Sequence, residues 1–157
     1  MNAAIQKIVE ELKMQAHPEG GYFVETYRSE ITLEQIQKSL ATVIYFLLPS
    51  SETSSWHRIK SDEFWFYHAG SPIVVHTIEN GTYKATVVGN ALENGEIPQY
   101  LVPAGAVFGA SVQQEDSYSL VSCVVAPGFD FEDFELFTQQ QMLGLFPQLE
   151  KEIDLLF

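Results

Sequence analysis

The sequence predicts an all-β protein with a short helix at each end. At least eight short runs of β-branched and aromatic residues follow one another, separated by turns rich in Gly, Pro and Asn. Apolar residues recur at helical spacing only near the two termini. Strands of this length and spacing are typical of a β-sandwich or a β-barrel. With 157 residues, the chain is long enough for one domain with a sizeable core and too short for two ordinary ones.

The elements follow from changes in the hydrophobic period. A helix is expected within residues 1–16, where Ile5, Ile8 and Leu12 share a face, and it should end before the Pro-Glu-Gly-Gly turn at 18–21. Asn80-Gly81 between two strand-like runs predicts a hairpin with a type I′ turn. Helical spacing returns in residues 138–157. The expected strands are 22–28, 41–48, 64–68, 73–78, 82–88, 99–102, 106–111, 118–125 and 131–136.

Charge and cysteine content narrow the class of partner. The formal net charge is -13, with 8 Lys and Arg residues against 21 Asp and Glu residues. Such a chain repels phosphate backbones and anionic lipid surfaces, so neither nucleic acid nor a membrane is an expected partner. No apolar stretch approaches the length of a membrane span, and the N-terminus lacks a signal-peptide pattern. The single Cys123, in an apolar run, fits a buried core residue in a reducing compartment, so a cytoplasmic location is expected.

The most informative segment runs from Ser54 to Gly70. His57, Glu63 and Gly70 have the spacing of the first cupin motif, and Pro103-Ala104-Gly105 is similar to the start of the second. Ile59 and Phe108 stand where that family usually places two further histidine metal ligands. The resemblance therefore implies a cupin barrel in which half of the usual metal-ligand set is replaced by apolar side chains.

The resemblance is closer still to a cupin subfamily of unknown function. Four blocks match it in order: residues 17–28 (HPEGGYFVETYR), 56–65 (WHRIKSDEFW), 102–105 (VPAG) and 120–131 (LVSCVVAPGFDF). The subfamily usually has Trp-Gln after the Pro-x-Gly turn, whereas this chain has Phe108-Gly109. The resemblance implies a double-stranded β-helix, the cupin jelly-roll barrel, over residues 22–136 within one domain of residues 1–157. It also implies pairing into a homodimer.

The residue types of the central motif suit proton transfer. Imidazole titrates near neutral pH, so His57 is a candidate general base, and Glu63 is the carboxylate expected to orient it. Strand alternation places Glu63, Trp65 and Tyr67 on one face, which makes Tyr67 a candidate acid. This arrangement resembles the metal-independent sugar-nucleotide epimerases of the cupin superfamily. The alternative is that His57 and Glu63 form a buried pair in a binding barrel.

Further side chains are candidates for ligand contact. Arg28 is expected in the pocket and Arg58 at its rim, where a guanidinium grips carboxylate or phosphate groups. Glu25 and Tyr27 share one face of their strand, and Arg28 joins them only if a β-bulge intervenes. The ring of Trp65 could stack on a sugar or another planar ligand, with core packing as the alternative.

Three functional hypotheses follow. The first is a metal-independent isomerase or epimerase for a small, sugar-like or carboxylated substrate, with His57, Glu63 and Tyr67 as its catalytic groups and no cofactor. The second is a non-catalytic cupin that binds a small molecule in the same pocket. The third is a divalent-metal cupin with a reduced ligand set, completed by His17, His68 or His76. It is disfavoured because alternation places His68 on the opposite face from Glu63 and gives His76 apolar neighbours.

Overall fold

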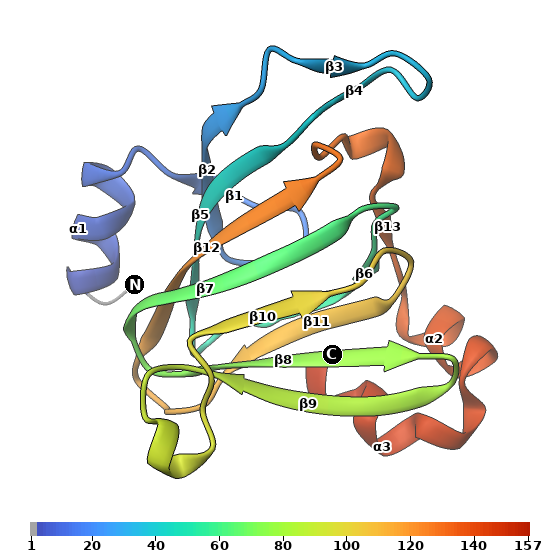
Figure 1. Cartoon of the computed structure of the whole chain (residues 1–157). Coiled ribbons are helices and arrows are strands. Elements are labelled where there is room, and N and C mark those ends of the chain that lie inside the picture. Colours follow the sequence, from blue (N-terminus) through green and yellow to red (C-terminus); the bar gives the residue numbers. More distant parts are fainter. Residues whose placement is uncertain (1–2) are drawn as a thin grey trace.

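The computed structural model describes residues 3–157 as two β-sheets packed face to face (Figure 1). Neighbouring segments of one sheet come from distant parts of the chain, as in a jelly roll. The first sheet has the order β1 (Gln15–Ala16), β2 (Tyr22–Arg28), β5 (Thr42–Pro49), β12 (Tyr118–Ala126), β7 (Asp62–Gly70) and β10 (Gln99–Val102). The second has the order β13 (Glu135–Leu136), β6 (Ser54–Arg58), β11 (Val107–Val112), β8 (Ile73–Glu79) and β9 (Thr82–Val88). The predicted jelly-roll barrel with short terminal helices is confirmed.

The main hydrophobic core lies between the two sheets. Strand β12 shows how it forms: Val121, Cys123 and Val125 are buried, while the residues between them are only partly covered. This alternation follows from the period of two in an extended strand, which points successive side chains to opposite faces. On the neighbouring strand β7 the same rule turns Glu63 and Trp65 toward the interior. The interior face of β7 therefore carries a carboxyl group into an otherwise apolar layer.

Helices cover the outer face of each sheet. Helix α1 (Ala3–Glu11) inserts Ile5 beside Leu47 on the outer face of the first sheet. At the other end of the chain, α2 (Gln139–Leu145) and α3 (Glu150–Ile153) pack on the second sheet around Trp56. The indole N–H of Trp56 donates to the carbonyl of Ile153 at 2.9 Å, which ties this C-terminal segment to β6. In Figure 1 the two helical ends lie on opposite sides of the barrel.

Short connections complete the chain. Strands β3 (Thr32–Leu33) and β4 (Lys38–Ser39) form a small hairpin that projects beyond the sheets (Figure 1). The remaining elements are four 3₁₀ turns: η1 (Leu92–Asn94), η2 (Phe131–Asp133), η3 (Pro147–Leu149) and η4 (Asp154–Leu156). Of the helices in the described part of the chain, none has the length and apolar character needed to cross a membrane.

The predicted hairpin at Asn80-Gly81 is confirmed. Both residues have positive φ, 49° and 75°, and the flanking strands pair directly, with Glu79 opposite Thr82. A type I′ turn needs positive φ at both central positions, which Asn and Gly tolerate at low cost.

The main differences from the prediction are a shorter first helix, a later start of the last strand and a strand that was missed. The first helix ends at Glu11 rather than near residue 16, because Lys13 takes a left-handed φ of 55° and Gln15–Ala16 then pairs with β2. The start of that predicted helix, residues 1 and 2, lies outside the described part. The expected strand 131–136 begins with the turn η2, because the Asp130 carboxylate accepts the Glu132 backbone N–H and closes the turn. Strand β6, which carries His57, was not predicted as a strand.

Candidate functional site

A cavity of about 330 Å³ opens between the two sheets. This volume is at the lower end of the range of small-molecule sites. Its apolar lining is mostly aromatic: Phe23, Ile44, Phe46, Ile59, Trp65, Val125, Phe129, Phe131 and Phe134. Its polar lining is rich in titratable groups: His17, Glu19, Glu25, Arg28, Thr42, His57, Glu63, Cys123 and Asp130. An apolar pocket with a few convergent polar groups is the usual form of a ligand site.

His57 occupies the inner end of this cavity. Strand β6 is held between β11 and β13, which place Phe108 and Leu136 opposite His57. The imidazole is 3% exposed, and its ring centre lies 4.0 Å from that of Phe108. Its Nδ1 lies 2.7 Å from the Ser55 carbonyl oxygen, and its Nε2 lies 3.1 Å from Oε2 of Glu19. Both ring nitrogens therefore have partners within the protein.

The carboxyl partner of His57 is Glu19, which corrects the expectation that Glu63 orients this ring. Glu19 comes from the turn before β2, and its backbone is fixed there because its carbonyl accepts the N–H of Ser55 at 2.8 Å. Its other carboxyl oxygen accepts the hydroxyl of Ser54 at 2.8 Å. The turn and β6 are 35 residues apart in sequence at these two positions. Pairing between distant segments thus supplies the partner.

The contacts of His57 indicate which ring nitrogen carries a hydrogen. Because a carbonyl only accepts, Nδ1 carries it in the neutral ring, which leaves Nε2 unprotonated 3.1 Å from Oε2 of Glu19. Burial lowers the pKa of His57 to about 4 and raises the pKa of Glu19. Both directions favour the uncharged pair, in which the proton of the Glu19 carboxyl lies within reach of Nε2. We call Glu19 and His57 the proton couple.

His17 adds a second imidazole from the same turn. The Glu19 backbone N–H donates to its Nδ1 at 3.2 Å, so in the neutral ring the hydrogen is on Nε2. Nε2 has no hydrogen-bond partner among residues 3–157. Burial lowers the pKa of His17, with an opposing contribution from the Glu19 charge. The ring therefore presents a neutral N–H donor in the cavity lining, supported by an edge contact to Phe23 at 4.7 Å.

Glu63 lies in the cavity wall without a histidine partner. Burial, and to a lesser extent the charge of Glu19, raises the pKa of Glu63 to about 8, while a hydrogen bond from the Cys123 thiol opposes the shift. Cys123 itself is 2% exposed, and burial raises its pKa well above the usual value. A thiol in this environment is not an activated nucleophile, in agreement with the prediction of a core cysteine.

Trp65 also lines the cavity, as predicted for a ligand-contacting ring. It is 1% exposed and packs edge-on against Phe46 and Phe108 at 5.9 and 6.4 Å between ring centres. Its indole N–H is buried and has no hydrogen-bond partner within the described part of the chain. Its position satisfies both sequence interpretations, since the ring is part of the core and part of the cavity wall.

A β-bulge in β2 brings Glu25 and Arg28 together. Glu25 pairs with Ile44 and Tyr27 with the adjacent Val43, so Thr26 is the extra residue. The bulge reverses the facing of the following residues, and the guanidinium of Arg28 donates to both carboxylate oxygens of Glu25 at 2.9 and 2.8 Å. Both side chains line the cavity mouth. Tyr27 does not line the cavity and is 53% exposed, which corrects its assignment as a ligand contact.

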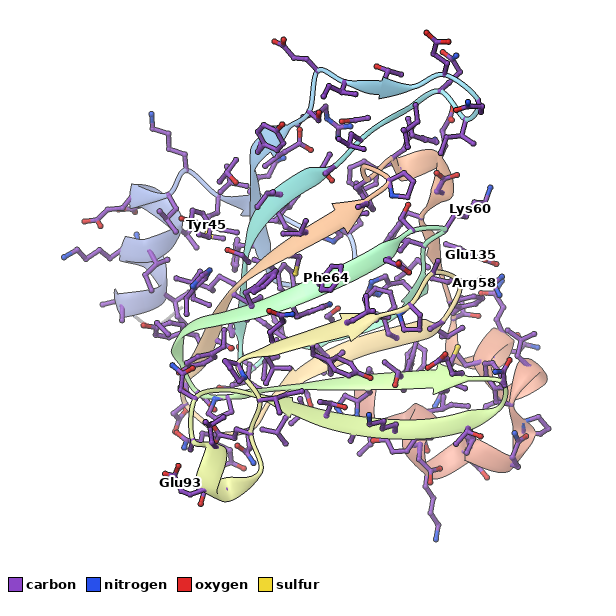
Figure 2. The ribbon with its side chains drawn as sticks, in the orientation of Figure 1. Tyr45, Arg58, Lys60, Phe64, Glu93 and Glu135 are labelled. Carbon is purple, nitrogen blue, oxygen red and sulfur yellow. The ribbon has the colours of Figure 1, made fainter. Side chains whose placement is uncertain are left out.

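Tyr67 and Arg58 lie away from the cavity. Tyr67 faces the core as predicted, but four residues beyond Glu63 it is displaced by about 13 Å along the strand. Its hydroxyl donates to the Gly70 carbonyl. Arg58 pairs with Glu135 at 2.6 Å and covers the ring of Phe137. Figure 2 shows Arg58 and Glu135 beside each other at the edge of the barrel. Neither the predicted acid nor the predicted rim guanidinium reaches the cavity.

The donor set does not fit a divalent metal. Among residues 3–157, no group of three or more His, Cys, Asp or Glu side chains is arranged to hold a metal ion. Ile59 and Phe108 fill two of the usual ligand positions with buried apolar groups. His68 bonds to Ser122, and His76 lies between the hydroxyls of Tyr83 and Ser111.

Glu19, the carboxyl group nearest the ring of His57, was not among the predicted site residues, and His17 was considered only as a possible metal ligand. The Pro-Glu-Gly-Gly segment was interpreted as a turn, and the signal that marks it as more was the concentration of matched family residues within 17–28. The close approach of this turn explains its glycines. A Cβ atom on Gly20, whose φ is 113°, would come within 2.1 Å of the Thr53 carbonyl oxygen next to β6.

Comparisons with known proteins agree with this architecture. Residues 6–137 match the family model described as Cupin superfamily (DUF985). An uncharacterized protein from Saccharomyces cerevisiae is 32% identical over 99% of this chain and 86% of its own length. A hypothetical protein from Leishmania major has a similar structure, with a TM-score of 0.90, 40% identity and coverage of 96% of this chain and 97% of its own.

Two further solved structures share this fold, one at high and one at low sequence identity. A protein from Shewanella oneidensis has a TM-score of 0.91 and 38% identity, over 99% of this chain and 97% of its own. An oxalate decarboxylase from Bacillus subtilis has a TM-score of 0.59 at 16% identity, over 90% of this chain and 37% of its own, which shows the shared fold alone. From the family match and the relatives that extend over its whole length, the chain belongs to the DUF985 family of the cupin superfamily.

Proposed function

We propose that the protein binds a small, sugar-like substrate in this cavity and catalyses metal-independent proton transfer on it, as an isomerase. The observation that carries this proposal is the proton couple, a buried imidazole and carboxyl 3.1 Å apart in the wall of the cavity. Titratable groups with strongly shifted pKa values, placed in a cleft, are typical of acid–base sites. Aromatic walls also suit the apolar faces of a sugar ring.

The couple is able to act as a base through Glu19. When the carboxyl proton of Glu19 moves to Nε2 of His57, Glu19 becomes a carboxylate beside an imidazolium that stabilises it. This carboxylate accepts the proton from a carbon next to the substrate carbonyl, and the electron pair of the broken C–H bond forms the C=C bond of an enediolate. General bases of this kind contribute about 10²–10⁴-fold to a rate.

His17 is suited to stabilise that enediolate. Its Nε2–H is a neutral donor with no hydrogen-bond partner among residues 3–157, and the negative charge of the reaction develops on the former carbonyl oxygen. The hydroxyl proton on the carbon that lost its hydrogen then moves to this oxygen, and Glu19 delivers its proton to the former carbonyl carbon. Atoms and charge balance, and the carbonyl has moved by one carbon.

The position of Tyr67 favours an isomerase over an epimerase. Inversion at one carbon needs a proton donor on the face opposite the base, and the predicted donor is outside the cavity. A 1,2-proton transfer needs only one base, because the same group removes and returns the proton on one face. The single proton couple matches that requirement.

Deuterium incorporation tests this proposal. The protein is incubated in D₂O with a panel of small aldoses and hydroxyketones, and NMR follows exchange at the carbon next to the carbonyl. Wild-type protein should catalyse exchange into at least one substrate, and Glu19→Gln should abolish it because an amide keeps the hydrogen bonds but holds no transferable proton. Tyr67→Phe should exchange at the wild-type rate. Exchange that survives Glu19→Gln rules out the proton couple as the base.

A non-catalytic binding cupin is the second candidate. It is favoured by the observation that both ring nitrogens of His57 already have protein partners, as in a structural pair. It predicts saturable binding of a small molecule with no exchange on long incubation. A divalent-metal cupin predicts stoichiometric metal by elemental analysis after purification without chelators.

A further inference from the structure

Glu63 is a buried titratable group that the proposed proton transfer does not use. Its residue is 8% exposed, and no cationic side chain among residues 3–157 pairs with it. The other carboxyl groups of the cavity are all matched: Glu19 by His57, Glu25 by Arg28, and Asp130 by Lys38 at 2.9 Å. The hydrogen bond that Glu63 receives comes from the neutral thiol of Cys123. When Glu63 ionises, no cationic side chain among residues 3–157 balances its charge, which leaves that role to a ligand.

The walls of the cavity that Glu63 lines suit a cation. Six aromatic side chains line the cavity, and three of them, Phe129, Phe131 and Phe134, contact one another with ring centres 4.8, 6.0 and 6.2 Å apart. Aromatic faces are electronegative and attract ammonium groups, most strongly where water is excluded. Aromatic rings combined with an unpaired carboxyl are the recognised chemistry of organic-cation sites.

The charges of the lining disfavour an anion. Arg28 is the one cationic side chain that lines the cavity among residues 3–157, against four residues with carboxyl groups. Its guanidinium already donates to both oxygens of Glu25 and to the Phe129 carbonyl. A carboxylated ligand would therefore meet no uncommitted cation, and it would have to approach Glu25 and Asp130.

We propose that the ligand of this cavity carries an organic ammonium group, held among the aromatic rings with Glu63 as its counter-ion. The inference deepens the proposed function, because it takes the same cavity as the substrate site and specifies an amino-substituted, sugar-like compound. It assigns Glu63 a binding role separate from the chemistry of Glu19 and His57.

A dependence of binding on pH follows. The titratable groups facing the cavity are His17 and Glu19 from the turn, Glu25 and Arg28 on β2, His57 on β6, Cys123 on β12 and Asp130 after it. Glu63 is largely protonated at pH 7, so a bound cation must release its proton. Affinity for a cation should rise by about tenfold between pH 7 and pH 9, the gain in the ionised fraction of a group with a pKa of about 8. Affinity for an uncharged ligand should not rise with it.

Choline and 3,3-dimethyl-1-butanol provide the probe, because they share a shape and differ in the charge of one atom. Binding is followed by NMR of the two indole N–H signals. Trp65 lines the cavity, whereas Trp56 is bonded to Ile153 beneath the C-terminal helices and serves as an internal reference. At pH 9 choline should shift the Trp65 signal with at least tenfold higher affinity than the alcohol, while the Trp56 signal stays in place.

Two variants complete the test. Glu63→Gln should bring the affinities of choline and the alcohol to within about twofold of each other and remove the pH dependence. Glu135→Gln, which removes an exposed carboxylate paired with Arg58 outside the cavity, should behave like wild type. An unchanged Trp56 signal verifies the fold of each variant.

Equal affinities in the wild type, retention of the preference in Glu63→Gln, or no saturable binding of choline at pH 9 would each overturn the proposal. The measurement needs no turnover, so absence of deuterium exchange would contradict the isomerase without affecting the cation site. Exchange activity together with equal affinities would contradict the cation site alone.

Discussion

Two buried histidines of this protein look alike by burial and differ in what surrounds them. His57 is 3% and His76 is 5% exposed, both have two engaged ring nitrogens, and burial lowers the pKa of each to about 4. His76 lies between the hydroxyl groups of Tyr83 and Ser111 and is not among the residues that line the cavity. His57 contacts a carboxyl group at the wall of a cavity.

This difference shows what a shifted pKa does and does not indicate. Burial alone depresses the pKa of an imidazole, so the shift marks desolvation at both positions. A role in proton transfer requires in addition a partner that itself exchanges protons and space for a substrate. Tyr83 and Ser111 supply neither at His76, whereas Glu19 and the adjoining cavity supply both at His57.

The largest expected effect separates the two histidines by activity. His57→Gln should lower the rate of deuterium exchange by about 10²–10⁴-fold, the range for loss of a general acid–base group. His76→Gln should leave the rate within about twofold, since its contacts are remote from the cavity. Parallel NMR assays of the two variants give the ratio. Similar losses in both would mean that burial, and not the proton couple, underlies the effect.

The second effect concerns stability, and here the affected residue is His76. His76→Leu leaves the hydroxyls of Tyr83 and Ser111 without their partner, and we expect a loss of about 1–3 kcal/mol in the free energy of unfolding. Urea unfolding followed by fluorescence measures it, with the exposed Lys7→Ala as a control expected within about 0.5 kcal/mol of wild type. An unaltered midpoint in His76→Leu would show that this network contributes no net stability.

The third effect is the loss of folding stability as the pH falls. For both histidines the folded pKa, about 4, lies below the unfolded value of 6.5, so the unfolded chain binds protons first as the pH falls. Stability is therefore present above pH 6.5 and is lost between pH 6.5 and 4, with a slope of up to about 1.4 kcal/mol per pH unit for each histidine. His76→Gln should flatten this slope by one proton equivalent in urea titrations between these limits.

Glu63 should act in the reverse direction. Its folded pKa of about 8 lies above the unfolded value of 4.5, so the folded state retains a proton that the unfolded chain releases. Its contribution is fully present below pH 4.5 and is lost as the pH rises toward 8. Urea unfolding of Glu63→Gln between pH 5 and 8 should lack this decline. If the stability of Glu63→Gln declined as steeply as that of the wild type, the group with the raised pKa would not be Glu63.

The smallest expected effect concerns the strand position that sequence alternation made a candidate acid. Tyr67→Phe removes one hydroxyl bonded to the Gly70 carbonyl and should cost about 0.5–1.5 kcal/mol of stability. Its exchange rate should match that of wild type within about twofold. A strongly reduced exchange rate in Tyr67→Phe would mean that Tyr67 takes part in the reaction, which would require a large movement of β7.

Much of the fold could be predicted because local patterns decide it. The strand at residues 118–125 and the Asn80-Gly81 turn are properties of a few consecutive residues, and both occur where expected. The boundary of helix α1 was missed for the complementary reason. Residues Gln15 and Ala16 join a sheet only because β2 lies alongside to accept them.

For the site, the sequence motifs were enough to place His57 and Glu63 in the barrel interior and Ile59 and Phe108 at the expected ligand positions. Which groups meet depends on the tertiary fold. Many neighbouring strands, such as β5 and β12 or β6 and β11, are separated by tens of positions in sequence, so the pairing of the strands sets the distance between their side chains. The turn before β2 therefore supplies Glu19 to His57, and the bulge at Thr26 turns Arg28 toward Glu25. Proximity across sheets depends on register, which local sequence patterns do not encode.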